Sequence, residues 1–92
     1  MQIIRDNNYL ASLDNVMQFI AQDSFNKALI FLDKLDYAIN NIPNFPYKHR
    51  QSFYYTNEDI RDLIFKGYTI PYLIDNGNNQ IVILDIFKWI NK

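Results

Sequence analysis

The sequence predicts an α+β fold, in which a short strand and a helical hairpin precede a three-stranded antiparallel meander and both helices cover one face of the sheet. Two observations support this prediction. Up to Pro43, apolar residues recur at every third or fourth position, which is the period of a helix buried on one side. Beyond residue 59 the period falls to two, as in strands, and two turn signals divide this part of the chain into three runs.

The first half of the chain supplies one strand and two helices. Residues 2–5, QIIR, fit a short strand that joins the sheet, and apolar residues at helical spacing predict a helix over 9–22. Ser24 is a good N-cap for a second helix over 25–41, because a serine side chain accepts a hydrogen bond from the first helical turn. Pro43 ends that helix, since it has no N–H and restricts the residue before it.

The second half supplies the meander. After a loop-rich bridge, strands are predicted over residues 60–65, 68–74 and 80–88. Gly67 should provide a positive φ in a tight, bulged turn between the first two strands, and DNGNN at 75–79 is a stronger turn signal between the next two. The last run is apolar on both faces, so we expect it in the middle of the sheet.

The middle strand of the meander has two faces, because successive side chains of a strand point to opposite sides. The side expected to pack on the helices carries Tyr68, Ile70, Tyr72 and Ile74. The other side carries Thr69, Pro71 and Leu73. Pro71 has no N–H to donate to a neighbouring strand, so it needs an edge or a non-bonded position, and the pattern alone does not supply one.

Composition narrows the class of protein. The chain has 92 residues, of which 49% are hydrophobic, and this predicts a single domain over residues 1–92. The absence of cysteine excludes disulfides and thiolate metal sites, and a single histidine excludes a multi-histidine metal site, so we expect no metal and no cofactor. No apolar run is long enough to span a membrane, and the first ten residues lack a signal-peptide stretch, which predicts a cytoplasmic protein.

Charge is low overall and uneven along the chain. The net charge is −1, with three basic and five acidic groups in residues 1–43 and six basic and five acidic groups in residues 44–92. General affinity for nucleic acid needs a basic surface, and this chain has at most a local one.

The densest cationic cluster is the triplet Lys-His-Arg at residues 48–50. This cluster could bind a phosphate or help an RNA 2′-hydroxyl to attack. It could equally be part of a solvated surface loop. His49 has the pKa range of a general base, although a single surface histidine is commonly inert. Tyrosines can stack on bases, but at strand spacing they more commonly belong to a core. The tyrosines in question are Tyr54, Tyr55, Tyr68 and Tyr72.

Two further cations are candidates for function. Arg61 lies in a predicted strand, where it could anchor a phosphate or a partner, or else pair with Asp59 or Asp85. Lys88 ends the last predicted strand, where it could line a functional groove or cover Trp89 with its aliphatic stem. The residues alone do not decide between these readings.

The order of elements, together with IRDLIFKGYTIPYLID at 60–75 and IVILDIFKWIN at 81–91, resembles the RelE/ParE superfamily of bacterial toxins over nearly the whole chain. Members often show an arginine before the hairpin, a Gly-Tyr pair that opens a strand ending in a tyrosine and an aliphatic pair, and a last aliphatic strand that ends in a basic or histidine residue. The matching positions here are Arg61, Gly67-Tyr68, Tyr72, residues 81–87 and Lys88.

This resemblance implies a toxin of a type II toxin–antitoxin system, which inhibits bacterial growth and takes part in plasmid stabilization. The implied partner is a cognate antitoxin whose disordered tail folds along the toxin. RelE-like members cut messenger RNA in the ribosomal A site, whereas ParE-like members poison DNA gyrase and cut no RNA. The implied target is therefore the ribosome or gyrase, with no small-molecule substrate and no membrane.

The sequence departs from the nuclease branch of this superfamily. RelE-like nucleases follow the Gly-Tyr pair with an arginine, where this chain has Thr69, and place lysines on the preceding strand at about the positions of Ile60 and Asp62. They put an arginine just after the last strand, near Trp89, and continue into a segment with a catalytic tyrosine, whereas this sequence ends at Lys92. Stabilising the extra charge of a phosphorane takes preorganised cations, which a threonine hydroxyl cannot replace.

The resemblance therefore favours a ParE-like toxin that is not a nuclease. The face with Thr69, Pro71 and Leu73 is the one that RelE-like toxins turn toward RNA, and its apolar character suits protein binding better. The alternative is an mRNA endoribonuclease with a different catalytic set, which would be Arg61, His49, Lys88 and Glu58. A third reading is a degenerate, non-toxic module that binds only an antitoxin or operator DNA.

Overall fold

The computed structural model describes residues 1–88 of the 92-residue chain, and its elements follow the predicted order. The elements are β1 (Gln2–Arg5), α1 (Asn7–Asp23), α2 (Phe25–Asn40), the 3₁₀ turns η1 (Ile42–Asn44) and η2 (Pro46–Lys48), β2 (Ile60–Phe65), β3 (Tyr68–Asp75), β4 (Gln80–Ile83) and β5 (Phe87–Lys88). The first strand, both helices and the first two strands of the meander lie within two residues of their predicted bounds.

Side-chain caps define where the helices begin. The Asp6 carboxylate accepts a hydrogen bond from the Asn8 N–H at 2.9 Å at the start of α1. Ser24 is the N-cap of α2 as predicted, since its hydroxyl accepts from the Lys27 N–H at 3.2 Å, and its own N–H donates to the Ile20 carbonyl at the end of α1. One residue thus joins the two helices. Neither helix of the described chain is long and apolar enough to cross a membrane.

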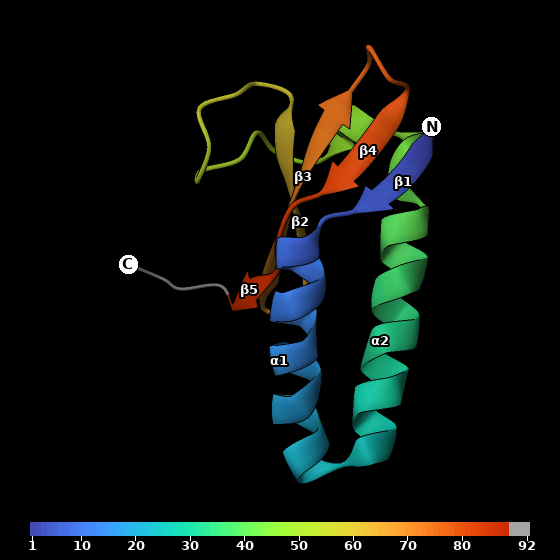
Figure 1. Ribbon diagram of the computed structural model, residues 1–92, viewed down its shortest axis with the longest axis vertical. Coiled ribbons are helices and arrows are strands. Elements are labelled where there is room, and N and C mark those ends of the chain that lie inside the picture. The colour runs from blue at the N-terminus through green and yellow to red at the C-terminus, as the bar shows by residue number, and fades with distance from the viewer. Residues whose placement is uncertain (89–92) are drawn as a thin grey trace.

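The sheet has the strand order β1-β4-β3-β2. β2, β3 and β4 are antiparallel neighbours, while β1 runs parallel to β4. β4 therefore has a neighbour on each side, which confirms the central place predicted for the last apolar run. In Figure 1, α1 and α2 stand side by side as an antiparallel pair, and their connection lies at the far end from β1 and β4.

The core lies between the helical hairpin and one face of the sheet. Tyr9 of α1 and Leu35 of α2 are fully buried in it. The helix-facing side of β3 contributes as predicted, with Ile70, Tyr72 and Ile74 in the core and Tyr68 packed against it. Burial of each such aliphatic side chain contributes about 1.5–3 kcal/mol to the free energy of folding. The helical and strand spacings of the apolar residues stabilise the fold because they bring these side chains to one buried face.

The single strand predicted over residues 80–88 is wrong in one respect, because it is interrupted between β4 and β5. At the interruption, the three residues 84–86 stand opposite two residues of β3, which makes a β-bulge. One of those two residues is Pro71, which has no N–H to donate but whose carbonyl accepts from the Leu84 N–H at 2.9 Å. The bulge thus gives the proline the non-bonded position that it requires.

The two hairpin turns use the residues that the sequence singled out. Lys66 and Gly67 have φ angles of 49° and 84°, so the predicted positive φ of the glycine is confirmed. The flanking residues pair directly, so this is a two-residue turn and the predicted bulge is absent from it. In the second turn, the Asp75 carboxylate accepts from the Asn78 N–H at 3.2 Å, and Asn79 takes the left-handed conformation at φ 53°.

Candidate functional site

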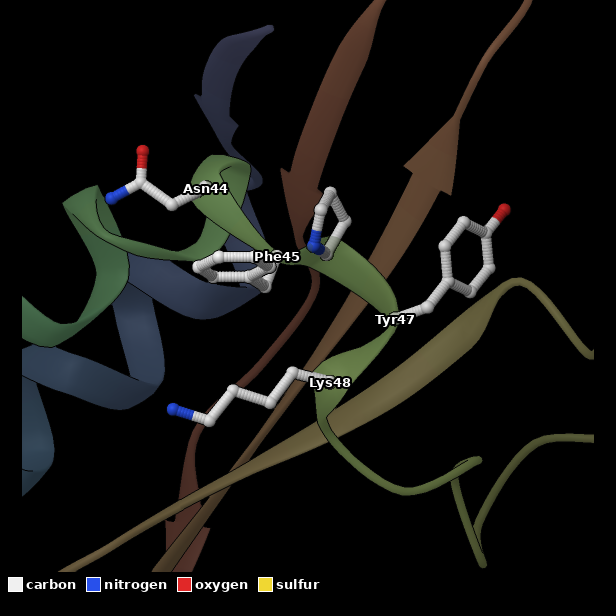
Figure 2. A pocket seen from close by; sticks show the side chains of 5 residues that line it. Asn44, Phe45, Tyr47 and Lys48 are labelled. Carbon is white, nitrogen blue, oxygen red and sulfur yellow. The ribbon is translucent and has the colours of Figure 1, made fainter.

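Two adjoining cavities lie where the chain leaves α2. A cavity of about 600 Å³ is lined by residues 44–48, and a second, of about 430 Å³, extends from it toward α2 and β2. Figure 2 shows that Phe45 and Lys48 point to the same side of the backbone, whereas Tyr47 points to the other side. The second cavity is lined by Tyr37, Ala38, Asn41, Ile42, Asn44, Phe45, Lys48, His49 and Leu63.

The 3₁₀ turns η1 and η2, with the residue between them, form a ledge over residues 42–48 beside these cavities. One strong hydrogen bond holds this ledge to the core. The hydroxyl of Tyr72, a fully buried residue of β3, donates to the Pro46 carbonyl at 2.6 Å. Burial raises the pKa of Tyr72 above its ordinary value, which keeps the hydroxyl protonated and able to donate. The ledge is therefore a fixed surface with an apolar aromatic side chain, Phe45, and one cation, Lys48, on the same side.

His49, a sequence candidate, lines the second cavity. Its ring lies edge-on to that of Tyr72, with 6.0 Å between ring centres. Partial burial, and to a lesser degree the charge of Lys48, lower its pKa below the ordinary value of 6.5. The imidazole is thus neutral at neutral pH and can act as a hydrogen-bond donor and acceptor in the cavity wall.

Arg61 has a local structural role in the described chain. One nitrogen of its guanidinium, Nη1, donates to the His49 carbonyl at 3.1 Å, and Nε donates to the Glu58 carbonyl at 3.3 Å. The guanidinium also lies 5.0 Å from the centre of the Tyr47 ring. Within residues 1–88 it forms an ion pair with neither of the two aspartates that the sequence suggested. The arginine therefore fastens both ends of the loop that leads into β2.

The four candidate nuclease residues come together only in part. Arg61 contacts His49 and Glu58, but through their backbone carbonyls, and the Glu58 side chain is exposed. Lys88 lies on β5, with its ammonium 5.8 Å from the Phe19 ring of α1. In the sheet register, Arg61 stands opposite Tyr72 and Lys88 stands opposite Tyr68, so their backbone positions are offset by about 13 Å along β3.

The face that carries Thr69 is not open at Thr69 or Pro71, so the prediction that this apolar face suits protein binding is wrong for these two residues. Both residues are fully buried. The physical reason is non-local, because the chain between η2 and β2 contacts the neighbours of these two residues on the same face. The Phe53 N–H donates to the side chain of Asp62, the β2 residue that pairs with Pro71. The Tyr54 ring packs on Phe87, the β5 residue that pairs with Thr69. Trp89, which stands near the position of a nuclease arginine, lies outside the described residues.

Asp62 of β2 anchors this covering segment. Its side chain is completely buried and its Oδ2 accepts from the Phe53 N–H at 3.2 Å and from Arg50 Nη2 at 3.4 Å. The Asp62 N–H in turn donates to the Arg50 carbonyl at 3.1 Å. Asp62 Oδ1, Arg50 Nε and Thr69 Oγ1 have no hydrogen-bond partner among the residues described. An aspartate inside an apolar strand run, IRDLIF, is the sequence signal that would have found this anchor.

Residues 51–57, which we call the aromatic loop, form the outer part of this segment. Phe53, Tyr54 and Tyr55 are 73%, 47% and 38% exposed. The Tyr54 ring packs edge-on against Phe87 of β5, with 4.9 Å between centres. Burial, and then the nearby carboxylate of Asp85, raise the pKa of Tyr55. The loop therefore bridges β2 and β5 while it presents aromatic surface to solvent.

In the portion of the chain that the structure describes, no group of three or more carboxylate or imidazole side chains could hold an ion. The polar side chains that line the cavities are two asparagine amides, two tyrosine hydroxyls, one lysine and one neutral histidine. These groups can donate hydrogen bonds to, and accept them from, a bound molecule.

Comparisons with known proteins agree with this description of the fold. The family model described as "ParE toxin of type II toxin-antitoxin system, parDE" matches residues 3–88. A solved structure titled "Chromosomal ParDE TA system from P. aeruginosa" superposes with a TM-score of 0.79 at 17% sequence identity, over 98% of this chain and 97% of that chain. At that identity the likeness concerns the fold alone. No curated protein is a match for this sequence.

Proposed function

The chain belongs to the ParE toxin family of type II toxin–antitoxin systems, and from this premise we propose that it stops bacterial growth by poisoning DNA gyrase rather than by cutting RNA. We also propose that residues 1–92 act as one toxin domain.

The observation that carries this proposal is the arrangement of cations. Cleavage of RNA by its 2′-hydroxyl needs cations aimed at the position where the phosphorane forms. Here the guanidinium of Arg61 is occupied by two backbone carbonyls, and Lys88 lies far along the sheet from it. Thr69, which the resemblance places at the position of a nuclease arginine, is fully buried. A protein that works by binding another protein needs none of these groups to converge.

The partner that we propose is a cognate antitoxin, as membership in the family suggests. The ledge and its two cavities are suited to apolar side chains from an extended or helical tail. Lys48 and the amides of Asn41 and Asn44 stand beside the aromatic surface, where they can satisfy polar groups of that tail. If co-expression with a neighbouring small open reading frame neither relieves toxicity nor yields a complex, the partner proposal fails.

Two assays on the purified protein separate the mechanisms. The first incubates bacterial gyrase and relaxed plasmid with the protein and measures loss of supercoiling and accumulation of cleaved DNA, both of which we expect. The second is primer extension on ribosome-bound message, which should show no new ends. Codon-positioned cuts that vanish in Arg61→Ala or Lys88→Ala would overturn the proposal in favour of a nuclease.

A further inference from the structure

The aromatic loop combines exposed aromatic side chains with a buried polar anchor, Asp62. Neither the cavities nor the proposed antitoxin contact involves this loop. We infer that the aromatic loop, residues 51–57, is the surface through which this toxin contacts its protein target. The inference rests on the proposed function in that the target is a folded protein. It does not depend on the antitoxin or on the cavities beside α2.

The composition of the loop is that of a protein-binding surface. Its sequence, QSFYYTN, contains no charged residue. Interface centres are enriched in aromatic residues and depleted of charge, and antibody paratopes use tyrosine for contact area together with serine and asparagine for adaptable hydrogen bonds. Phe53, at 73% exposed, is the most exposed of the three aromatic side chains.

The chemistry of the loop selects a protein over a nucleic acid. Aromatic side chains also stack on bases, but nucleic-acid binding depends on cations that contact phosphates. The nearest preceding cation, Arg50, lies 3.4 Å from the buried carboxylate of Asp62 and packs over the Phe53 ring at 3.8 Å. Its charge is therefore paired within the fold, and the charged groups that act on Tyr55 of the loop are carboxylates, which repel a phosphate backbone.

The loop is also preorganised. The Ser52 N–H donates to the Ile60 carbonyl at 2.8 Å, and the Phe53 N–H donates to Asp62. At the other side, the Tyr54 ring rests on Phe87. Because these contacts fix the backbone on two strands, less conformational freedom is lost when the aromatic side chains are covered by a partner.

The test compares two exposed phenylalanines. Phe53→Ser removes the most exposed aromatic side chain of the loop, while Phe25→Ser, at a residue 68% exposed at the start of α2, is the matched control. Each protein is titrated against bacterial gyrase with relaxed plasmid, and each gene is induced in bacteria to measure growth. Circular dichroism melting reports whether each variant folds, and Tyr55→Ser is a second loop variant.

We expect the concentration of Phe53→Ser that half-inhibits gyrase to rise at least tenfold, with unchanged potency for Phe25→Ser, because central aromatic contacts dominate protein interfaces. If both loop variants inhibit gyrase as strongly as the wild type, the inference fails while the proposed function stands. If the wild type stops growth but leaves gyrase unaffected, the proposed function fails. The inference is then tested by growth alone, and it fails if both loop variants stop growth as strongly as the wild type. A wild-type protein that inhibits neither overturns both. Loop variants that stay toxic but escape neutralisation by the antitoxin would assign the loop to the antitoxin and overturn the inference.

Discussion

Substitutions of Asp62 separate the contribution of its charge from that of its hydrogen bonds. In Asp62→Asn the side-chain oxygen can keep the bond from the Phe53 N–H, and the amide nitrogen gains a possible acceptor in the Thr69 hydroxyl, which has no partner within residues 1–88. Thr69 is the diagonal neighbour of Asp62 across β2 and β3, on the same face of the sheet. Asp62→Ala loses every one of these contacts.

The expected magnitudes follow from the geometry. The bond to Phe53 is worth about 1 kcal/mol net, and the Arg50 pair about 0.5–1 kcal/mol because the Arg50 side chain is 33% exposed and can hydrate. The void left by truncation adds about 1 kcal/mol. We therefore expect Asp62→Ala to lower the free energy of unfolding by about 2–3 kcal/mol and Asp62→Asn by less than about 1 kcal/mol. In a domain of this size the alanine variant should melt roughly 10–20 °C lower.

Urea titration followed by far-ultraviolet circular dichroism measures both values, and a double-mutant cycle with Arg50→Ala isolates the pair, for which we expect a coupling of about 0.5–1 kcal/mol. Hydrogen exchange should show faster exchange of the Ser52 and Phe53 amides in the alanine variant than in the asparagine variant. An asparagine variant as unstable as the alanine variant would refute the reasoning, since the negative charge itself would then hold the loop.

Three further substitutions test other parts of the fold. Tyr72→Phe removes the donor to the Pro46 carbonyl and should lower the free energy of unfolding by about 1–2 kcal/mol in urea titration, and a loss below about 0.3 kcal/mol would contradict this role. Because the pKa of His49 is lowered in the fold, the unfolded chain binds a proton more readily, so stability is present above pH 6.5 and lost as the pH falls through that value; His49→Gln should flatten this part of the pH profile, and an unchanged profile would sink the assignment. Gly67→Ala should cost about 1 kcal/mol through strain at φ 84° alone, since nothing lies within 4 Å of the added Cβ, so a stable variant would mean that the turn relaxes.

The fold was predictable because the signals that define it are local. Ser24 caps α2 through its own next turn, and Leu35 and Ile39 reach the core by helical spacing alone. The alternation of β3 likewise placed Tyr72 against the helices. The bulge after β4 was missed because it arises from Pro71 on the neighbouring strand, and a pairing partner is not visible within a single run of sequence.

The candidate site was less predictable because it depends on where a loop lies. Arg61 and His49 were singled out as chemical groups, and the structure does bring them together, but with the arginine bound to a backbone carbonyl. Thr69 was predicted to be a departure from a cationic position, but its burial was not predicted, because the segment that contacts its neighbours on this face is distant in the sequence. Asp62 was noted only because it stands at about the position of a nuclease lysine. A carboxylate within an apolar strand, however, requires a hydrogen-bonding or charged partner when it is buried, and this requirement implies that another segment of the chain packs beside it.

The buried carboxylate explains how a small domain can present Phe53, Tyr54 and Tyr55 to solvent in one arrangement. Fixing the backbone of each loop residue costs about 1–2 kcal/mol, and the exposed aromatic rings gain little from the core to offset it. An apolar side chain in place of Asp62 would bury well in the strand, but it could not accept the Phe53 N–H or attract Arg50. The loop would then sample many conformations, and a partner would have to order it upon binding. A carboxylate at this position therefore stabilises the strand less than an apolar side chain would, but it holds the loop in one conformation. This is the arrangement expected where a surface loop carries the function.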